Sequence, residues 1–279
     1  MVVGNRIKDI IGKILNMKKY LVIGNPIEHS LSPKLHNYWI KKNKLNAIYD
    51  KKLFEKNNIQ NVIEDIKKEN IHGLNVTIPF KKLVIPFLDD LSYEAKQTQS
   101  VNTIYKEGDK VIGHNTDAAG FELSLRYLRY DVKNKDVLIL GAGGVVSSII
   151  FSLKKMGASK IIISNRTKEK AEQLKKIFSN IEIINWGEVV NCEMIVNATS
   201  IGLKKNDEIE IDYEKVGKNK FFYDIIYNPK ETNFLKKGKF FGNKIENGRM
   251  MFIYQAHQSF TIWHKIMPKI DDETIKLLD

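Results

Sequence analysis

Two charged side chains in the first half of the chain are candidates for moving a proton. Lys81 lies near the end of the block GLNVTIPFKK at residues 73–82, and Asp117 lies within GHNTDAAGF at residues 113–121. A lysine that faces an aspartate across a cleft can give a proton to a carbonyl group as it is reduced, while the carboxylate orients the ammonium. For each residue alone, ordinary loop polarity is the alternative. Further polar residues interrupt the hydrophobic pattern nearby, namely Asn75, Thr77, Asn102, Thr103, Asn115 and Thr116.

A pair of serines, Ser30 and Ser32, lies in GNPIEHSLSPKLHN between a short apolar run and a predicted helix. Ser32 followed by Pro33 predicts a helix N-cap with proline at the first helical position. Two hydroxyl groups and free backbone N–H groups at such a place can bind an anion. Capping accounts for Ser32 alone but not for Ser30, so an anion site and a simple helix start both stay open.

The stretch VLILGAGGVVSSI at residues 137–149 combines an apolar strand, a glycine-rich turn and a helix start. This order fits the pyrophosphate of a dinucleotide, because Gly141 permits a tight turn and Gly143 lets the backbone approach the phosphates. Val146 replaces the third glycine of the usual fingerprint, so the motif alone also allows a structural turn. The candidate loop consists of Gly141, Ala142, Gly143 and Gly144.

The residues after the next predicted strand bear on the choice of dinucleotide. In NAD-binding versions an acidic residue about twenty positions after the loop holds the ribose 2′-hydroxyl. This chain has Asn165, Arg166 and Thr167 at that place. A guanidinium and a hydroxyl can bind a phosphate there, whereas a surface arginine at a helix N-cap is the other interpretation. The missing acid favours NADP over NAD.

These residues must be positioned by two sets of strands and helices. The first half alternates predicted strands at 20–23, 47–51 and 73–77 with helices at 33–42 and 59–69, which is typical of a parallel α/β sheet. A new βαβ unit begins near residue 136, and a long helix rich in aromatics covers 250–266. The predicted fold class is α/β, with a Rossmann-like NADP-binding domain, a parallel-sheet substrate domain and a cleft between them. The later strands are predicted at 136–140, 160–164, 181–184, 194–197 and 221–225, and the helices at 145–156 and 168–178.

Composition and charge restrict the class of protein. The chain has 279 residues, 43% of them hydrophobic, and a formal net charge of +12. Its lysines are dispersed, which favours small anionic ligands over nucleic acid. Cys192 is the one cysteine, so no intramolecular disulfide is possible, and no apolar run reaches the ~20 residues of a membrane span. The six histidines lack the spacing of a metal site, so we expect no bound metal. Together these features predict a soluble cytoplasmic protein.

Nine blocks together resemble the shikimate dehydrogenase family, in the order in which that family carries them and over almost the whole chain from about residue 17. The blocks are GNPIEHSLSPKLHN, GLNVTIPFK, VNTI, NTDAAGF, GAGG, NRT, NATSIG, YDIIYNP and GRMMFIYQAHQSF. The resemblance implies an NADP-dependent oxidoreductase that acts on a CH–OH group. The implied reaction is the reversible NADPH-dependent reduction of 3-dehydroshikimate to shikimate, in chorismate and aromatic amino-acid biosynthesis.

The resemblance also assigns roles to individual residues. Ser30 and Ser32 are expected to bind the substrate carboxylate, and Lys81 matches the catalytic lysine with Asp117 as its partner. Asp117 is also expected to contact the substrate. The remaining residues expected to do so are Asn75, Thr77, Asn102, Tyr227 and Gln255. The residues expected to bind NADP are Gly141, Ala142, Gly143, Gly144, Asn165, Arg166, Thr167, Lys170, Thr199 and Gly248.

Family architecture implies a substrate-binding domain at 17–117, completed by C-terminal helices at 248–279, and an NADP-binding Rossmann domain at 118–247. Because the sequence from Met17 already resembles a complete family N-terminus, residues 1–16 are predicted to be a dispensable extension. Ser100, Val146 and Leu203 depart mildly from the family pattern. These departures leave cofactor affinity open.

Two alternatives to this interpretation predict different sequence features. A quinate/shikimate dehydrogenase paralogue that uses NAD would carry an acidic residue after the second Rossmann strand, and the chain has none there. A nucleic-acid-binding regulator would show clustered basic residues with interleaved aromatics. We therefore expect a small-molecule substrate, no nucleic-acid or membrane partner, and a monomer or homodimer.

Overall fold

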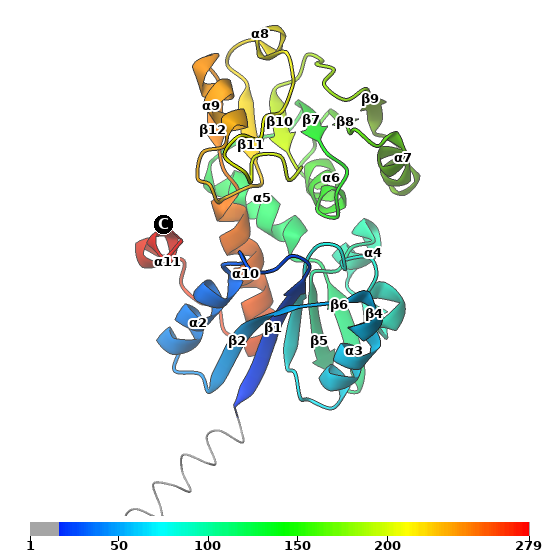
Figure 1. Ribbon diagram of the computed structural model, residues 1–279, viewed down its shortest axis with the longest axis vertical. Helices are drawn as coiled ribbons and strands as arrows, with labels where there is room; N and C mark the ends of the chain where they lie inside the picture. The colour runs from blue at the N-terminus through cyan, green and yellow to red at the C-terminus, as the bar shows by residue number, and fades with distance from the viewer. Residues whose placement is uncertain (1–16, 279) are drawn as a thin grey trace, which may run out of the picture. The chain divides into compact units, whose positions relative to one another are not determined.

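The computed structural model describes residues 17–278, so the predicted extension at 1–16 lies outside the described part. This part divides into two compact units (Figure 1). The first unit comprises the described residues up to Ser92, then Val101–His114, and the residues from Ala256 onward; the second comprises Tyr93–Ser100 and Asn115–Gln255. The two-domain α/β fold predicted from the sequence is confirmed. The assignment of substrate and cofactor roles to the units stays a prediction.

The first unit is built on a mixed six-stranded sheet in the order β2-β1-β3-β5-β6-β4. β1 pairs in parallel with both β2 and β3, as the α/β alternation predicted. β5 and β6 form an antiparallel hairpin next to β3, and the sequence pattern did not reveal it because these strands carry charged residues between short apolar pairs. The strands are β1 Lys18–Gly24, β2 Ala47–Leu53, β3 Gly73–Val76, β4 Asp90–Leu91, β5 Thr103–Glu107 and β6 Lys110–His114.

Helices cover the first sheet through aromatic and aliphatic side chains. The rings of Trp39 in α2 (Ser32–Lys42) and Phe260 in α10 (Arg249–His264) pack edge to face, with centroids 5.6 Å apart. α11 (Asp272–Lys276) lies beside α2 in Figure 1, and Lys42 forms an ion pair with Asp271 at 2.9 Å. α3 (Ile59–Lys67) buries a face of Ile59, Val62, Ile63 and Ile66, whose spacing is that of an amphipathic helix.

The start of α2 differs from the prediction. Leu31 occupies the N-cap position without a side-chain capping bond, and Ser32 is the first helical residue, followed by Pro33. The Ser30 hydroxyl accepts a hydrogen bond from the Ser32 N–H at 3.3 Å. Ser30, rather than Ser32, thus supplies a side-chain acceptor to an N–H group at the start of this helix. The predicted N-cap role of Ser32 is therefore wrong.

The second unit contains a six-stranded sheet in the order β12-β11-β10-β7-β8-β9, and all of its pairings are parallel. The chain order reverses between β7 and β10, which is the switch point of the Rossmann arrangement. Ligands of such sheets bind outside the carboxyl ends of the strands at this point. The strands are β7 Asp136–Leu140, β8 Lys160–Ser164, β9 Glu182–Ile184, β10 Met194–Asn197, β11 Phe221–Asp224 and β12 Lys244–Glu246.

Alternating residues of β7 enter two separate hydrophobic clusters. Val137 and Ile139 belong to one cluster, and Leu138 and Leu140 belong to the other. This strand is therefore buried on both faces, as expected for a central strand of a parallel sheet. The helices that belong to this unit are α4 Tyr93–Thr98, α5 Asp117–Tyr127, α6 Val146–Lys155, α7 Lys168–Ile177, α8 Tyr213–Val216, α9 Asn233–Phe240 and the first part of α10.

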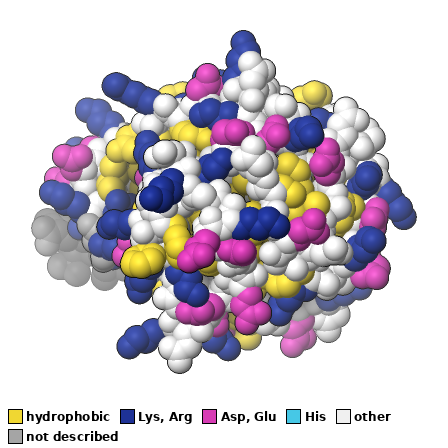
Figure 2. Space-filling view, turned by 90° about the horizontal axis from the view of Figure 1, so that it is seen from above, with side chains coloured by type: hydrophobic (Ala, Val, Ile, Leu, Met, Phe, Trp, Pro, Cys, Tyr) yellow, Lys and Arg dark blue, Asp and Glu magenta, His cyan; other side chains and the backbone are white. Residues whose placement is uncertain are grey.

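The surface carries mixed charge. Figure 2 shows lysine and arginine side chains interspersed with aspartate and glutamate over the face that it displays. This mixing agrees with a sequence of 45 basic and 33 acidic residues whose lysines are dispersed. Within residues 17–278, no helix is long and apolar enough to cross a membrane.

Candidate functional site

Three of the predicted substrate residues lie together at the carboxyl end of β3. Asn75 is 7% exposed, and its side-chain amide donates to the carbonyl oxygen of Asn102 at 3.0 Å. The Asn102 carbonyl also accepts the N–H of Val76 at 2.9 Å. Thr77 follows directly and donates its N–H to the carbonyl of Ile23 at 3.0 Å. The structure thus brings Asn75, Thr77 and Asn102 together in the first unit.

The serine pair belongs to the same unit. Ser30 is half-buried and Ser32 is buried, and the two are joined by the bond from the Ser32 N–H to the Ser30 hydroxyl. Ser32 also has a side-chain hydrogen bond with Tyr49, a residue of β2 that the sequence analysis did not single out. Tyr49 donates its phenol hydrogen to Oδ1 of Asn75 at 2.7 Å. The predicted carboxylate-binding and ring-binding residues are therefore linked through Tyr49.

The predicted proton-transfer pair is divided between the units. Lys81 belongs to the first unit, is 9% exposed, and its carbonyl accepts the N–H of Val101 at 2.9 Å. Asp117 belongs to the second unit, is 6% exposed, and is the first residue of α5, where the helix dipole favours a carboxylate. Asp117 is thus held on a helix, whereas Lys81 lies in the turn that follows β3, and their pairing stays a prediction.

Tyr227 and Gln255, also predicted to contact the substrate, both belong to the second unit and lie around Phe252. The rings of Tyr227 and Phe252 stack with centroids 4.5 Å apart, and the Gln255 amide donates to the carbonyl of Phe252 at 2.9 Å. Gly120 of α5 packs against Gln255, since a Cβ there would lie 2.9 Å from the Gln255 Cβ. The predicted substrate residues are therefore distributed over both units.

The glycine loop after β7 has the backbone form that a dinucleotide requires. Gly141 has a φ of +112°, and a Cβ at this position would lie 2.9 Å from the carbonyl oxygen of Ala198. Gly143 is exposed, and a Cβ there would lie 3.9 Å from that same oxygen. The loop is thus tight at Gly141 and open at Gly143, ahead of the α6 N-terminus, so the residues present fit a pyrophosphate.

The turn after β8 is short, exposed and free of carboxylates. Asn165 fixes it by donating its side-chain amide to the carbonyl of Thr167 at 2.7 Å. Thr167 occupies the N-cap position of α7 without a side-chain capping bond, and Arg166 and Lys170 are exposed beside it. A 2′-phosphate at this turn would meet two cations and a hydroxyl. The turn therefore has the charge that suits NADP.

A buried polar network lies at the carboxyl ends of β10 and β11. Asp224 is 0% exposed and accepts hydrogen bonds from the Asn197 amide at 3.0 Å and the Thr232 hydroxyl at 2.6 Å. Burial raises the pKa of Asp224 to about 6, and these bonds oppose the shift. Asn197 in turn accepts the N–H and hydroxyl of Thr199 at 3.0 and 2.7 Å. The Thr199 hydroxyl is therefore engaged within its own loop.

Sequence reasoning did not assign functions to Tyr49, Asn197 or Asp224. Asn197 and Asp224 lie inside blocks of the family resemblance, which is a signal that could have drawn attention to them. Tyr49 lies in AIYDKKL, which carries no comparable signal. Gly248 is explained by its backbone, because a Cβ there would lie 2.0 Å from the Ile225 carbonyl oxygen.

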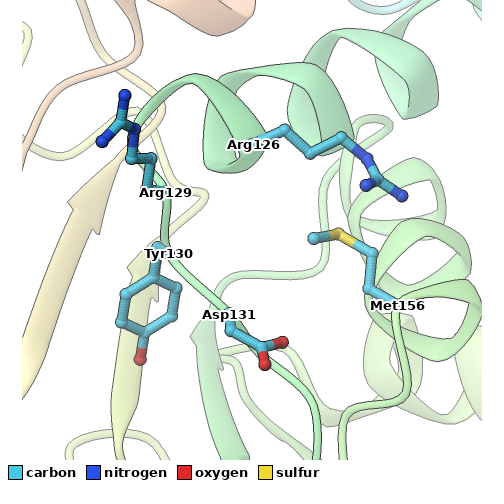
Figure 3. Close-up of a pocket in the computed structure, with 5 residues that line it drawn as sticks. All are labelled: Arg126, Arg129, Tyr130, Asp131 and Met156. Carbon is cyan, nitrogen blue, oxygen red and sulfur yellow. The ribbon is translucent and has the colours of Figure 1, made fainter.

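Two further features of the second unit contain none of the predicted site residues. A hollow of about 380 Å³ is lined by side chains from the end of α5, the following loop and the end of α6 (Figure 3). Cys192 is buried, and burial raises the pKa of its thiol to about 11, so it is not an activated nucleophile. The residues that line the hollow are Arg126, Arg129, Tyr130, Asp131 and Met156.

The fold and the glycine loop define a class, namely two-unit α/β proteins with a Rossmann dinucleotide-binding unit. Family models narrow this class. "Shikimate dehydrogenase substrate binding domain" matches residues 22–104, and "Shikimate / quinate 5-dehydrogenase" matches residues 122–231. A shikimate dehydrogenase (NADP(+)) of Pelagibacter ubique is 64% identical over 262 residues, which cover 94% of this chain and 99% of that protein. The chain belongs to the shikimate dehydrogenase family.

Solved structures agree with this assignment. The crystal structure of shikimate dehydrogenase from Aquifex aeolicus matches with a TM-score of 0.86 and 39% identity, covering 94% of this chain and 97% of that one. A shikimate dehydrogenase crystallised in complex with NADP⁺ matches with a TM-score of 0.86 and 35% identity, covering 95% and 94% of the two chains. The family resemblance predicted from the nine blocks is confirmed.

Proposed function

We propose that this protein is an NADP-dependent shikimate dehydrogenase that reversibly reduces 3-dehydroshikimate to shikimate for chorismate and aromatic amino-acid synthesis. The observation that carries the proposal is the 64% identity to a protein of that name over nearly the full length of both chains. The fit of the glycine loop and of the carboxylate-free turn after β8 supports the choice of cofactor.

Substrate binding is assigned to neutral hydrogen-bonding groups. The hydroxyls of Ser30 and Ser32 would hold the substrate carboxylate, and Asn75, Thr77 and Asn102 would contact the ring hydroxyls. Tyr227 and Gln255 would complete the contacts from the second unit. Because these residues carry no charge, they can orient the substrate in both protonation states of the reacting oxygen.

Proton transfer is assigned to Lys81 and Asp117. NADPH, when bound, supplies a hydride to the carbonyl carbon of 3-dehydroshikimate. Negative charge then develops on the carbonyl oxygen, and the Lys81 ammonium would give this oxygen a proton as the C–OH group forms. The Asp117 carboxylate would orient the ammonium and accept a bond from a ring hydroxyl. In the reverse direction Lys81 takes the proton back.

Cofactor binding is assigned to the second unit. The N–H groups of Gly141, Ala142, Gly143 and Gly144 would hold the pyrophosphate, and the loop at Thr199 and the backbone at Gly248 would lie near the nicotinamide. Arg166, Thr167, Asn165 and Lys170 would hold the 2′-phosphate. The single cysteine supports a cytoplasmic location, and the dispersed charge supports a small anionic ligand rather than a nucleic-acid partner. The proposed assembly is a monomer or homodimer.

The proposal is tested by following absorbance at 340 nm with the purified chain. Shikimate with NADP⁺ should give NADPH, and 3-dehydroshikimate with NADPH should consume it, with shikimate identified by NMR as the product. We expect NADP⁺ to exceed NAD⁺ in kcat/KM by at least about tenfold. No turnover of shikimate with either cofactor would overturn the proposal.

A second candidate follows from the family model whose description includes quinate. A quinate/shikimate dehydrogenase that uses NAD would oxidise both substrates. The same assay distinguishes the two, because that enzyme would oxidise quinate with NAD⁺ at a rate comparable to shikimate. The turn after β8, which offers Arg166 and no carboxylate, supports the NADP enzyme.

A further inference from the structure

Tyr49 is a buried residue that is hydrogen-bonded to Asn75 of the proposed substrate site. It is 1% exposed, and its ring stacks on His36 of α2 with centroids 4.1 Å apart and an interplanar angle of 4°. Its backbone exchanges two hydrogen bonds with the Asn37 side chain, at 2.7 and 2.9 Å. Tyr49 is thus fixed at both its backbone and its ring, so its hydroxyl has a defined position.

The hydroxyl of Tyr49 determines how Asn75 is oriented. A carboxamide can flip, and only its hydrogen-bond partners distinguish its oxygen from its nitrogen. The nitrogen of Asn75 faces three acceptors, namely the Asn102 carbonyl and the hydroxyls of Thr103 and Ser259, at 3.0 to 3.1 Å. The oxygen receives the Tyr49 hydrogen at 2.7 Å. Burial raises the pKa of Tyr49 well above 10, so the phenol stays a donor.

The same hydroxyl links Asn75 to the serine pair. Tyr49 also shares a side-chain hydrogen bond with Ser32. Since the phenol hydrogen is directed at Asn75, the Ser32 hydroxyl is the donor of this bond. One buried oxygen from β2 therefore joins the first residue of α2 to a residue of β3, and strands β2 and β3 are separated by β1.

We propose that Tyr49 is a positioning residue that sets the Asn75 carboxamide and the Ser32 hydroxyl for substrate binding. The inference rests on the proposed function, because Asn75 and Ser32 are its substrate residues. Both are ground-state contacts, so losing their alignment weakens the binding of substrate and transition state alike. Such a loss raises KM and leaves kcat nearly unchanged.

The test is the variant Tyr49→Phe, which removes one oxygen and keeps the stacked ring. We expect the KM for shikimate to rise roughly three- to tenfold, as for the loss of one buried hydrogen bond, with kcat and the KM for NADP⁺ within about twofold of the parent. Tyr20→Phe is the matched control: it also removes a buried phenol hydroxyl of the first unit, from a ring packed on Trp263 and His264. An unchanged KM in Tyr49→Phe, or an equal rise in Tyr20→Phe, would overturn the proposal.

A measurement without turnover separates this inference from the proposed function. The side-chain NH₂ resonances of Asn75, assigned through their loss in Asn75→Asp, should shift or broaden in Tyr49→Phe and stay in place in Tyr20→Phe. Unmoved resonances in Tyr49→Phe would overturn the positioning role even in an active enzyme. Failure of the parent protein to oxidise shikimate would instead overturn the proposed function, and the NMR result would still decide whether Tyr49 orients Asn75.

Discussion

Each unit holds a buried polar network, and the two networks differ in charge. The network of the first unit joins Ser32, Tyr49 and Asn75, and all of its side chains are neutral. The network of the second unit centres on the buried carboxyl group of Asp224. A neutral network suits a site that is proposed to receive a carboxylate, because a buried negative charge there would oppose the ligand.

The difference also predicts how each site responds to pH. Burial raises the pKa of Asp224 to about 6, so the second network changes its protonation near neutral pH. Burial raises the pKa of Tyr49 as well, but the ordinary pKa of a phenol is already about 10, so this hydroxyl stays protonated at neutral pH. The geometry of the first network should therefore be insensitive to pH where that of the second is not.

The largest expected effect tests whether the first unit supplies the proton. Lys81→Met should lower kcat by roughly 10²–10⁴-fold with little change in substrate KM, because positioned proton transfer acts only in the transition state. Circular dichroism should show that the variant is folded. A folded Lys81→Met with near-normal kcat would mean that another group donates the proton.

The next effect tests whether the second unit selects the cofactor. Arg166→Ala should raise the KM for NADP⁺ roughly ten- to a hundredfold, as for the loss of a charge-assisted phosphate contact worth about 1.5–3 kcal/mol, and should leave NAD⁺ kinetics nearly unchanged. Arg126→Ala is a matched control, because this arginine of the same unit is exposed and pairs with Glu122 at 2.9 Å. Equal damage to both cofactors would place Arg166 in the fold or at the pyrophosphate.

A smaller effect tests the protonation of Asp224 through the pH dependence of the free energy of unfolding. The folded-state pKa of Asp224 is raised from 3.8 to about 6, so between these values the folded protein keeps a proton that the unfolded chain has lost. The free energy of unfolding therefore falls as pH rises through this window. From pH 7 to pH 5 the parent should gain about 1 kcal/mol relative to Asp224→Asn. Parallel urea-unfolding results for the two proteins at pH 5, 6 and 7 would refute the raised pKa.

The sequence predicted the Rossmann strands well because they are buried on both faces. The predicted strands at 136–140, 160–164 and 194–197 coincide with β7, β8 and β10, each an apolar run that ends at a polar residue or glycine. The hairpin β5–β6 was missed, since its sequence mixes lysine and glutamate with apolar residues and so lacks a clear period.

The site was predictable only where residue type itself carries the chemistry. Gly141 and Arg166 were identified because a tight turn needs glycine and a phosphate favours a guanidinium. The role of Tyr49 could not be predicted, because its hydroxyl reaches Asn75 across a strand that separates their own strands in the sheet. The helix start at Ser32 was predicted wrongly, because the bond from its N–H to Ser30 depends on the local loop geometry.

The central claim is that the two networks serve different ligands, and one set of kinetic measurements tests it most directly. The KM values for shikimate and for NADP⁺ are compared in Tyr49→Phe and Asp224→Asn, assayed side by side at pH 7. We predict that Tyr49→Phe raises only the KM for shikimate. Asp224→Asn, which loosens the Asn197–Thr199 loop, should raise only the KM for NADP⁺, by roughly three- to tenfold. If either variant raises both KM values equally, the networks support the fold as a whole, and the claim that each network serves a different ligand is wrong.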